Sequence, residues 1–104
     1  MHYVVLASHS PDICPASNAK TKALLLELAP QIPSIAQKHG VNIVAGPLVN
    51  REHMTVVIVE TDRAEGLDDF LVDSRLGQWN QVHILPSRSL QEGLTEIQEG
   101  ASLF

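Results

Sequence analysis

The hydrophobic residues of this chain fall into four short β-branched runs, separated by stretches of helical periodicity. Residues 2–8, 41–49, 54–61 and 80–85 are rich in valine and isoleucine and predict four strands. Both alternating faces of the first run are apolar, which is typical of a central strand covered on both sides. Residues 9–17 hold two prolines and two serines and predict a loop.

Helical spacing marks the segments between these strands. A helix that begins near Asn18 carries apolar residues at positions 25, 28, 32 and 35, and prolines at positions 30 and 33 predict that it divides into two short helices. Asp62 and Glu65 predict a capping box for the next helix, which ends near residue 76. Ser89 and Glu92 predict a second capping box, at the start of a C-terminal helix.

Length and charge narrow the class of protein. The 104 residues predict a single domain over residues 1–104, and no apolar run reaches the ~18 residues that span a bilayer. The net charge of −5 argues against binding to nucleic acid, which requires clustered Lys and Arg. The start of the chain lacks the features of a signal peptide, and the single cysteine excludes an internal disulfide. We therefore expect a cytoplasmic protein that binds neither nucleic acid nor membrane.

The element order β-α-β-β-α-β carries a resemblance. Two interlocked right-handed βαβ units give an antiparallel sheet of order 4-1-3-2. This order resembles the ferredoxin-like fold, and the chain is similar to small members of the dimeric α/β-barrel superfamily over nearly its whole length. The resemblance implies an α+β sandwich with an extra C-terminal helix, paired as a homodimer or higher oligomer into a barrel. It also implies an oxidative or isomerising reaction on a small organic molecule.

This topology brings three connections to one end of the sheet: the loop after the first strand, the hairpin between the second and third, and the junction before the fourth. The polar and aromatic side chains expected at this end are His9, Cys14, Asn18, Asn50, Arg51, Glu52, His53, Arg75, Trp79 and Asn80. The end of the first strand faces the start of the third, so we expect His9 and His53 to lie close together.

His9, Cys14 and His53 offer two imidazoles and a thiolate, which are ligands for zinc, copper or haem iron. The spacing matches no known zinc-finger pattern, and the chain has no second cysteine. Cys14 precedes a helix, whose N-terminal end favours a thiolate, and Cys14-Pro15 resembles the dipeptide of haem-sensing motifs. The alternative is that both histidines are exposed and that Cys14 is a small buried apolar thiol.

The same end of the sheet is also a candidate binding site for a small molecule. His53 or His9 would be the general base, because imidazole titrates near neutral pH. Ligand-binding side chains would come from Asn18, Asn50, Arg51, Arg75 and Trp79, with the arginines gripping an anionic group. In the alternative interpretation Asn18 caps a helix, the arginines are solvated, and Trp79 packs in the core or at a subunit interface.

Two functional hypotheses follow. In the first, the chain binds a small molecule, with or without catalysis, in a polar pocket that holds a transition metal or haem near His9, Cys14 and His53. In the second, it is a non-catalytic dimeric or higher-order assembly or regulatory module, in which the C-terminal residues 101–104 dock onto a partner.

Overall fold

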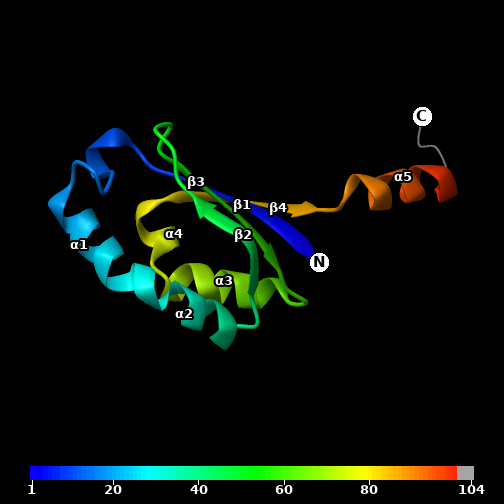
Figure 1. Ribbon diagram of the computed structural model, residues 1–104, viewed down its shortest axis with the longest axis horizontal. Helices are drawn as coiled ribbons and strands as arrows, with labels where there is room; N and C mark the ends of the chain where they lie inside the picture. The colour runs from blue at the N-terminus through cyan, green and yellow to red at the C-terminus, as the bar shows by residue number, and fades with distance from the viewer. Residues whose placement is uncertain (101–104) are drawn as a thin grey trace.

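Strands β1 and β3 lie at the centre of a four-stranded antiparallel sheet in the computed structural model, which describes residues 1–100 (Figure 1). β1 spans His2–Ser8 and β3 spans Met54–Glu60. The edge strands are β2 (Asn42–Leu48), beside β3, and β4 (Gln81–Ser87), beside β1. The expected α+β class and open antiparallel sheet are therefore confirmed, and the strand order is β2-β3-β1-β4.

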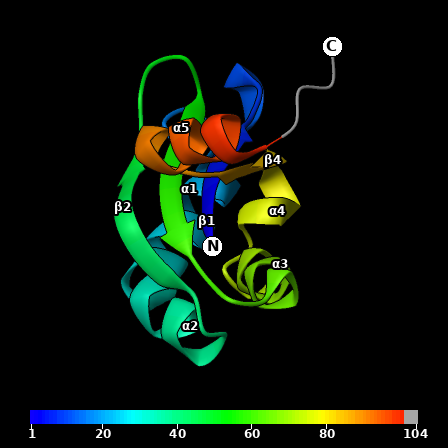
Figure 2. The same cartoon turned by 90° about the vertical axis from the view of Figure 1, so that its right-hand side faces the viewer.

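Helices α1 to α4 cover one face of the sheet, and α5 continues beyond the end of β4 (Figures 1 and 2). Their bounds are α1 Ala19–Leu28, α2 Ile32–Lys38, α3 Ala64–Asp73, α4 Leu76–Trp79 and α5 Leu90–Glu99, with short 3-10 helices at η1 Pro11–Ile13 and η2 Ala29–Gln31. Within residues 1–100, no helix has the length and apolarity needed to cross a membrane.

The pleat of β1 and β3 sends alternate side chains into the core under the helices. The pairs Val5–Val57 and Ala7–Thr55 face each other across the two strands on this buried face. Phe70 of α3, which is 1% exposed, packs against this face. A side chain on this face at the end of either strand therefore points into the space between the sheet and the helices.

The two short helices in tandem are found as expected. α1 ends at Leu28, and a single 3-10 turn that contains Pro30 leads into α2, which has Pro33 in its first turn. Proline removes a backbone donor there without loss, because the first N–H groups of a helix have no intrahelical partner. α2 ends before Gly40, whose φ of +69° is the left-handed conformation that favours glycine.

The start and end of α3 differ from the sequence prediction. The capping box of Asp62 and Glu65 is wrong, because α3 has Arg63 at its N-cap position, with no side-chain cap. Instead, the Thr61 hydroxyl accepts a hydrogen bond from the Arg63 backbone N–H at 3.3 Å. The helix also ends earlier than expected, at Asp73, because Arg75 adopts a left-handed φ of 64° and separates α3 from α4.

The C-terminal elements agree better with the sequence prediction. The Ser89 half of the capping box at α5 is confirmed, since the Ser89 hydroxyl accepts a hydrogen bond from the Glu92 backbone N–H at 3.1 Å. The Glu92 carboxylate accepts from the Ser89 hydroxyl at 3.3 Å. β4 continues through Pro86, which an edge strand tolerates because one side of its backbone needs no ladder partner. The expected docking of residues 101–104 onto a partner lies outside the described residues.

The other face of the sheet carries apolar side chains that no helix of residues 1–100 covers. By the pleat these are Val4, Leu6, Val56, Ile58 and Leu85. Leu85 is 46% exposed. The apolar side chains of α5 are also exposed, at 79% for Leu90 and 77% for Ile97. We call the five residues on β1, β3 and β4 the open sheet face.

One polar contact joins the two helical segments that cover the sheet. His39, which follows α2, donates through Nε2 to Oδ2 of Asp73 at the end of α3, at 2.5 Å. Lys38 lies 3.8 Å from the same carboxylate. The hydrogen bond from His39 lowers the pKa of Asp73 below its ordinary value of 3.8, and the charges of His39, Lys38 and Arg75 add to this effect.

We expect Asp73→Asn to lower the thermal midpoint of unfolding at neutral pH. Because the folded state holds the pKa of Asp73 below 3.8, it binds fewer protons than the unfolded state in acid, and stability is lost as the pH falls through the folded pKa. The deficit of the variant should therefore be full above pH 3.8 and vanish towards more acid pH. Calorimetry across this range checks it, and a deficit that does not change with pH would contradict the assignment.

Candidate functional site

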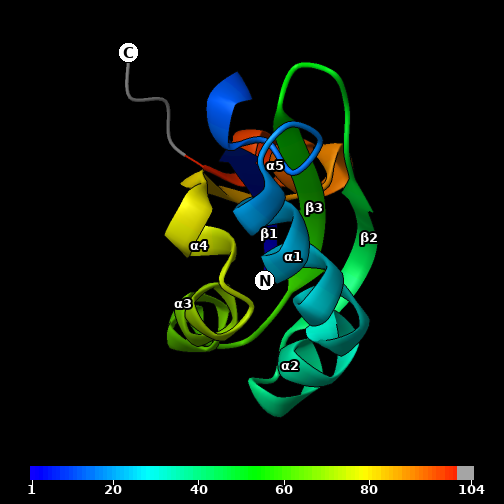
Figure 3. The ribbon, with the colours of Figure 1, turned by 90° about the vertical axis from the view of Figure 1, so that its left-hand side faces the viewer.

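The ends of β1 and β3 bring two histidines together. The backbone N–H of His9 donates to the carbonyl of His53 at 3.0 Å, which extends the ladder between the two strands by one step. The ring centroids lie 5.4 Å apart, with the planes at 73°. The expectation that His9 and His53 lie close together is confirmed, and in Figure 3 the loop after β1 and the β2–β3 hairpin lie at the same end of the sheet.

Cys14 is the third member of this cluster. One ring nitrogen of His9, one of His53 and the sulfur of Cys14 all lie within 4.8 Å of one another, and all three residues are half-buried. Turns hold the Cys14 backbone, whose carbonyl accepts from the N–H groups of Ser17 at 2.9 Å and Asn18 at 2.8 Å. Cys14 thus follows η1 and lies five residues before Ala19, where α1 begins. Cys14 therefore lies outside the first turn of α1.

Asn80 fixes which nitrogen of His9 carries the proton. The Asn80 amide group donates through Nδ2 to the carbonyl of Leu76 at 3.0 Å, so its oxygen Oδ1 is turned the other way. That oxygen lies 3.0 Å from His9 Nδ1. An amide oxygen can only accept, so Nδ1 must carry the hydrogen. In the neutral ring, Nε2 is then an unprotonated nitrogen with a free lone pair.

This Nε2 atom of His9 is buried and has no hydrogen-bond partner within residues 1–100. Buried polar atoms in folded proteins are almost always paired, so an orphaned acceptor calls for an explanation. Histidines that bind metal ions commonly donate their other ring N–H to a carbonyl or carboxylate, as His9 does to Asn80. The arrangement resembles that of a metal-binding histidine oriented by a second residue.

His53 adopts an unusual backbone conformation. Its φ of 58° lies in the left-handed region, which costs energy for a residue with a Cβ. Such conformations cluster at functional sites, where the surrounding structure holds them. Here the turn is closed by Asn50, whose side-chain oxygen accepts from the N–H groups of Glu52 at 3.0 Å and Met54 at 3.3 Å. The hairpin therefore presents the His53 ring to His9.

A cavity of about 310 Å³ opens beneath the cluster, between the sheet and the helices. Its wall is mainly aliphatic and aromatic, with contributions from Val5, Ala7, Leu25, Val57, Phe70 and Leu76. His9 and Cys14 line it, and His53 stands outside the lining, at the rim. Trp79 also lines the cavity, with its ring centroid 5.1 Å from that of His9.

The other expected ligand-binding residues are placed differently. Asn18 is the N-cap of α1, where its side-chain oxygen accepts from Lys20 N at 3.0 Å and Thr21 N at 3.1 Å. This satisfies first-turn donors that would otherwise lack partners. Asn50 lines the cavity edge, but its oxygen closes the hairpin turn. Arg51 is exposed at that turn and is not among the lining residues.

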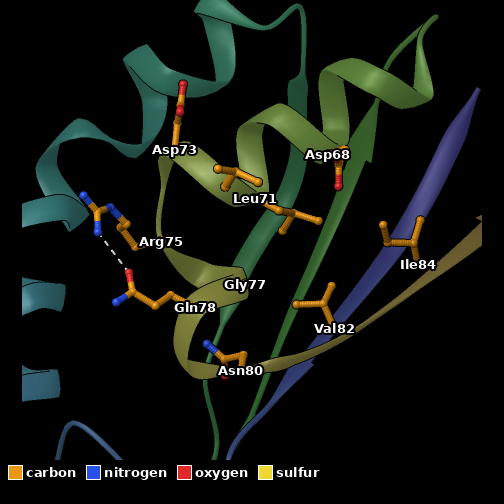
Figure 4. A pocket seen from close by; sticks show the side chains of 10 residues that line it. Asp68, Leu71, Asp73, Arg75, Gly77, Gln78, Asn80, Val82 and Ile84 are labelled. Atoms are coloured by element: carbon orange, nitrogen blue, oxygen red, sulfur yellow. Dashed lines mark hydrogen bonds between the residues drawn. The ribbon is translucent and has the colours of Figure 1, made fainter.

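Arg75 lies in a separate, larger groove between α3, α4 and β4, with a volume of about 810 Å³ (Figure 4). Its side chain turns to Gln78, whose Oε1 accepts from Arg75 Nη1 at 3.0 Å. The groove is open, and Val72 on its border is 62% exposed. The expected arginine grip on a ligand at the His9–His53 cluster is therefore not found for either arginine. We place the candidate site in the smaller cavity, next to which the two histidine nitrogens and the cysteine sulfur converge.

One cavity residue escaped the sequence analysis. Thr55 lines the cavity and is buried at 8% exposure, on the core-facing side of β3. Its neighbours on that face, Val57 and Val59, are apolar. A hydroxyl at one core-facing position of an otherwise apolar strand was the signal available in the sequence.

Comparisons with protein-family profiles and with curated proteins find no match to this chain.

We expect His9 to populate the Nδ1–H tautomer when its ring is neutral. Long-range proton–nitrogen correlation spectra should show a protonated Nδ1 and an unprotonated Nε2, because Asn80 Oδ1 accepts from Nδ1. Asn80→Ala should remove this preference, whereas Gln78→Ala, two residues away, should keep it. A proton on Nε2 in the unmodified protein would contradict the assignment.

Proposed function

We propose that the chain binds a transition-metal ion through His9, Cys14 and His53, and that the ion faces a cavity that takes a small organic molecule. The observation that carries this proposal is the buried, orphaned lone pair of His9 Nε2 beside a second imidazole and a thiol. Imidazole and thiolate together favour Zn²⁺ or copper over Mg²⁺ or Ca²⁺, which prefer oxygen ligands.

The distances support a site that closes around the ion. In a tetrahedral zinc site, ligand atoms lie about 3.3–3.8 Å apart, given Zn–N of about 2.0 Å and Zn–S of about 2.3 Å. The three atoms here lie within 4.8 Å of one another, so a pair needs to approach by at most about 1.5 Å. Rotation about side-chain bonds can bring the atoms closer, since all three residues lie in connecting segments outside the strands and helices.

A bare ion fits this cluster better than haem does. The porphyrin occupies the equatorial positions of haem iron and leaves only its two axial positions to the protein. Three protein ligands that converge on one point match an ion instead. The cavity of about 310 Å³ is also at the small end of organic-ligand sites, which makes it tight for a macrocycle.

Three protein ligands leave a coordination position of the ion for an exogenous group, as in catalytic zinc sites. An ion with this coordination position open can polarise a carbonyl or bind the oxygen of an organic molecule. An isomerising or oxidative reaction, with His9 and His53 as metal ligands rather than as general bases, is the enzymatic form of this proposal.

We expect Co²⁺, a spectroscopic substitute for Zn²⁺, to bind with a near-ultraviolet thiolate charge-transfer band. Cys14→Ser should abolish the band, and His9→Ala or His53→Ala should weaken binding strongly. Asn80→Ala should lower the affinity about 10- to 100-fold, because it removes the partner that orients His9. Absorption titration measures all of these.

His2→Ala is the matched control, since His2 lies at the opposite end of β1 and pairs with Glu60 at 3.4 Å. It should bind Co²⁺ like the unmodified protein. A protein that binds no Co²⁺, or one in which His2→Ala has the same effect as His9→Ala, would overturn the proposal.

A second function, that of a dimeric assembly module, has its own supporting observation in the open sheet face. Val4, Leu6, Val56 and Ile58 form a contiguous apolar surface across the two central strands. Large apolar patches are uncommon on monomers and usually mark interfaces. We propose that two copies pair through this face to form a barrel of two sheets. This pairing is compatible with the metal site, because the cavity opens on the helical side.

Leu6→Glu should convert the proposed homodimer to a monomer, because it would bury a carboxylate between two apolar sheets. Leu26→Glu is the control: Leu26 is 64% exposed on α1, away from the open sheet face. Sedimentation velocity at micromolar concentration should give a dimer for the unmodified protein and for Leu26→Glu. A stable monomer for the unmodified protein would contradict this second function.

A further inference from the structure

The cavity beneath the metal cluster has a lining that specifies what it can hold. Among its lining residues within the described part of the chain there is no Lys, Arg, Asp or Glu. Away from the metal cluster, a charged group placed there would lose its hydration without gaining an ion-pair partner from the lining, which is strongly unfavourable. Both arginines that could have gripped an anion lie elsewhere. The occupant is therefore neutral.

Size restricts the occupant further. The volume of about 310 Å³ equals that of about ten water molecules, at about 30 Å³ each in the liquid. This suits a molecule with a single ring. The rings of Trp79 and His9, with centroids 5.1 Å apart, form one wall of the cavity. Phe70 and mainly aliphatic side chains of the helices and the sheet line much of the rest. Such walls favour a flat, mostly apolar body.

Thr55 supplies the only hydroxyl among the described residues that line this cavity. It is 8% exposed and lies opposite Ala7, whose small side chain leaves space before it. Valine has the same shape and would satisfy an apolar wall without a polar atom. A hydroxyl at this position is useful when it hydrogen-bonds with something inside the cavity.

The position of Thr55 relative to the metal cluster determines how a molecule in the cavity would be oriented. Thr55 and His9 both line the cavity, and Thr55 pairs across the sheet with Ala7, two residues before His9. Two residues along a strand span about 7 Å. One ring with a polar substituent spans such a distance. A polar group on the ring would meet Thr55 at the inner end, and the opposite side of the ring, with any second oxygen substituent, would face the metal cluster.

We infer that the cavity binds a neutral, single-ring organic molecule that carries a hydroxyl or carbonyl group, and that Thr55 selects it by hydrogen bonding. This inference rests on the proposed function, because it names the class of ligand for that site. Thr55 is a specificity-determining residue here, and the metal ligands stand at the other end of the molecule.

Phenol, toluene and benzoate test this inference, because they share a ring and differ in one group: a neutral hydroxyl, a methyl or a carboxylate. Trp79 is the only tryptophan of the chain, so its fluorescence reports binding directly. Zn²⁺ absorbs no visible light and is not redox-active, so both the metal-free and the Zn²⁺-loaded protein can be titrated. Isothermal titration calorimetry gives the same affinities independently.

In the unmodified, metal-free protein we expect phenol to bind about 3- to 10-fold more tightly than toluene, which is the effect of one net hydrogen bond, and benzoate to bind most weakly. Thr55→Val should bring phenol to the toluene level and leave toluene unchanged, because valine has the same shape. Thr55→Ser keeps the hydroxyl and should keep the preference. Thr21→Val is the control, since Thr21 is equally buried at 8% but does not line the cavity.

Each contrary result overturns the inference. These results are equal binding of phenol and toluene, equal loss of both in Thr55→Val, tightest binding of benzoate, or no binding of any probe. The Co²⁺ titration separates this failure from that of the proposed function. A protein with the cobalt–thiolate band but no preference for phenol retains the metal site and loses only the ligand class.

Discussion

The antiparallel pairing of β1 with β3 is the constraint on which the rest of the structure depends. Its register puts Val5 opposite Val57 and Ala7 opposite Thr55 on the buried face, so it determines the floor of the core and of the cavity together. The last backbone bond of the same ladder joins His9 to His53. A slip of one residue would turn every one of these side chains to the other face. Core packing therefore protects the geometry of the site, because the site cannot shift without exposing the core.

Much of this arrangement follows from local patterns in the sequence. Apolar alternation identified the strands, the prolines near residue 30 divided the first helical segment, and the topology brought His9 beside His53. The failures share a physical cause, which is competition for polar groups by the nearby backbone. The Asn18 side chain caps α1, and Asn50 closes the hairpin turn. Arg75, whose backbone is left-handed, differs in that a neighbouring side chain, Gln78, accepts from its guanidinium. Such competition depends on dihedral angles that residue spacing alone does not determine.

The site combines a polar mouth with an apolar interior, and the two parts have different consequences. At the mouth, Leu76 orients Asn80 and Asn80 orients His9, so a backbone carbonyl controls a ring nitrogen through two hydrogen bonds. In the interior, the lack of lining charges keeps the local dielectric low, which strengthens any polar contact made there. A single hydroxyl can then discriminate between molecules of equal shape.

The left-handed backbone of His53 has an evolutionary consequence. Glycine or asparagine would relieve the conformational cost at this position, so selection for stability alone would replace the histidine. Retaining an imidazole there exchanges folding stability for a ring held in a fixed direction. In descendants of this chain that no longer needed that ring, we expect position 53 to be among the first to change. A glycine there would indicate that the site was lost while the sheet around it remained intact.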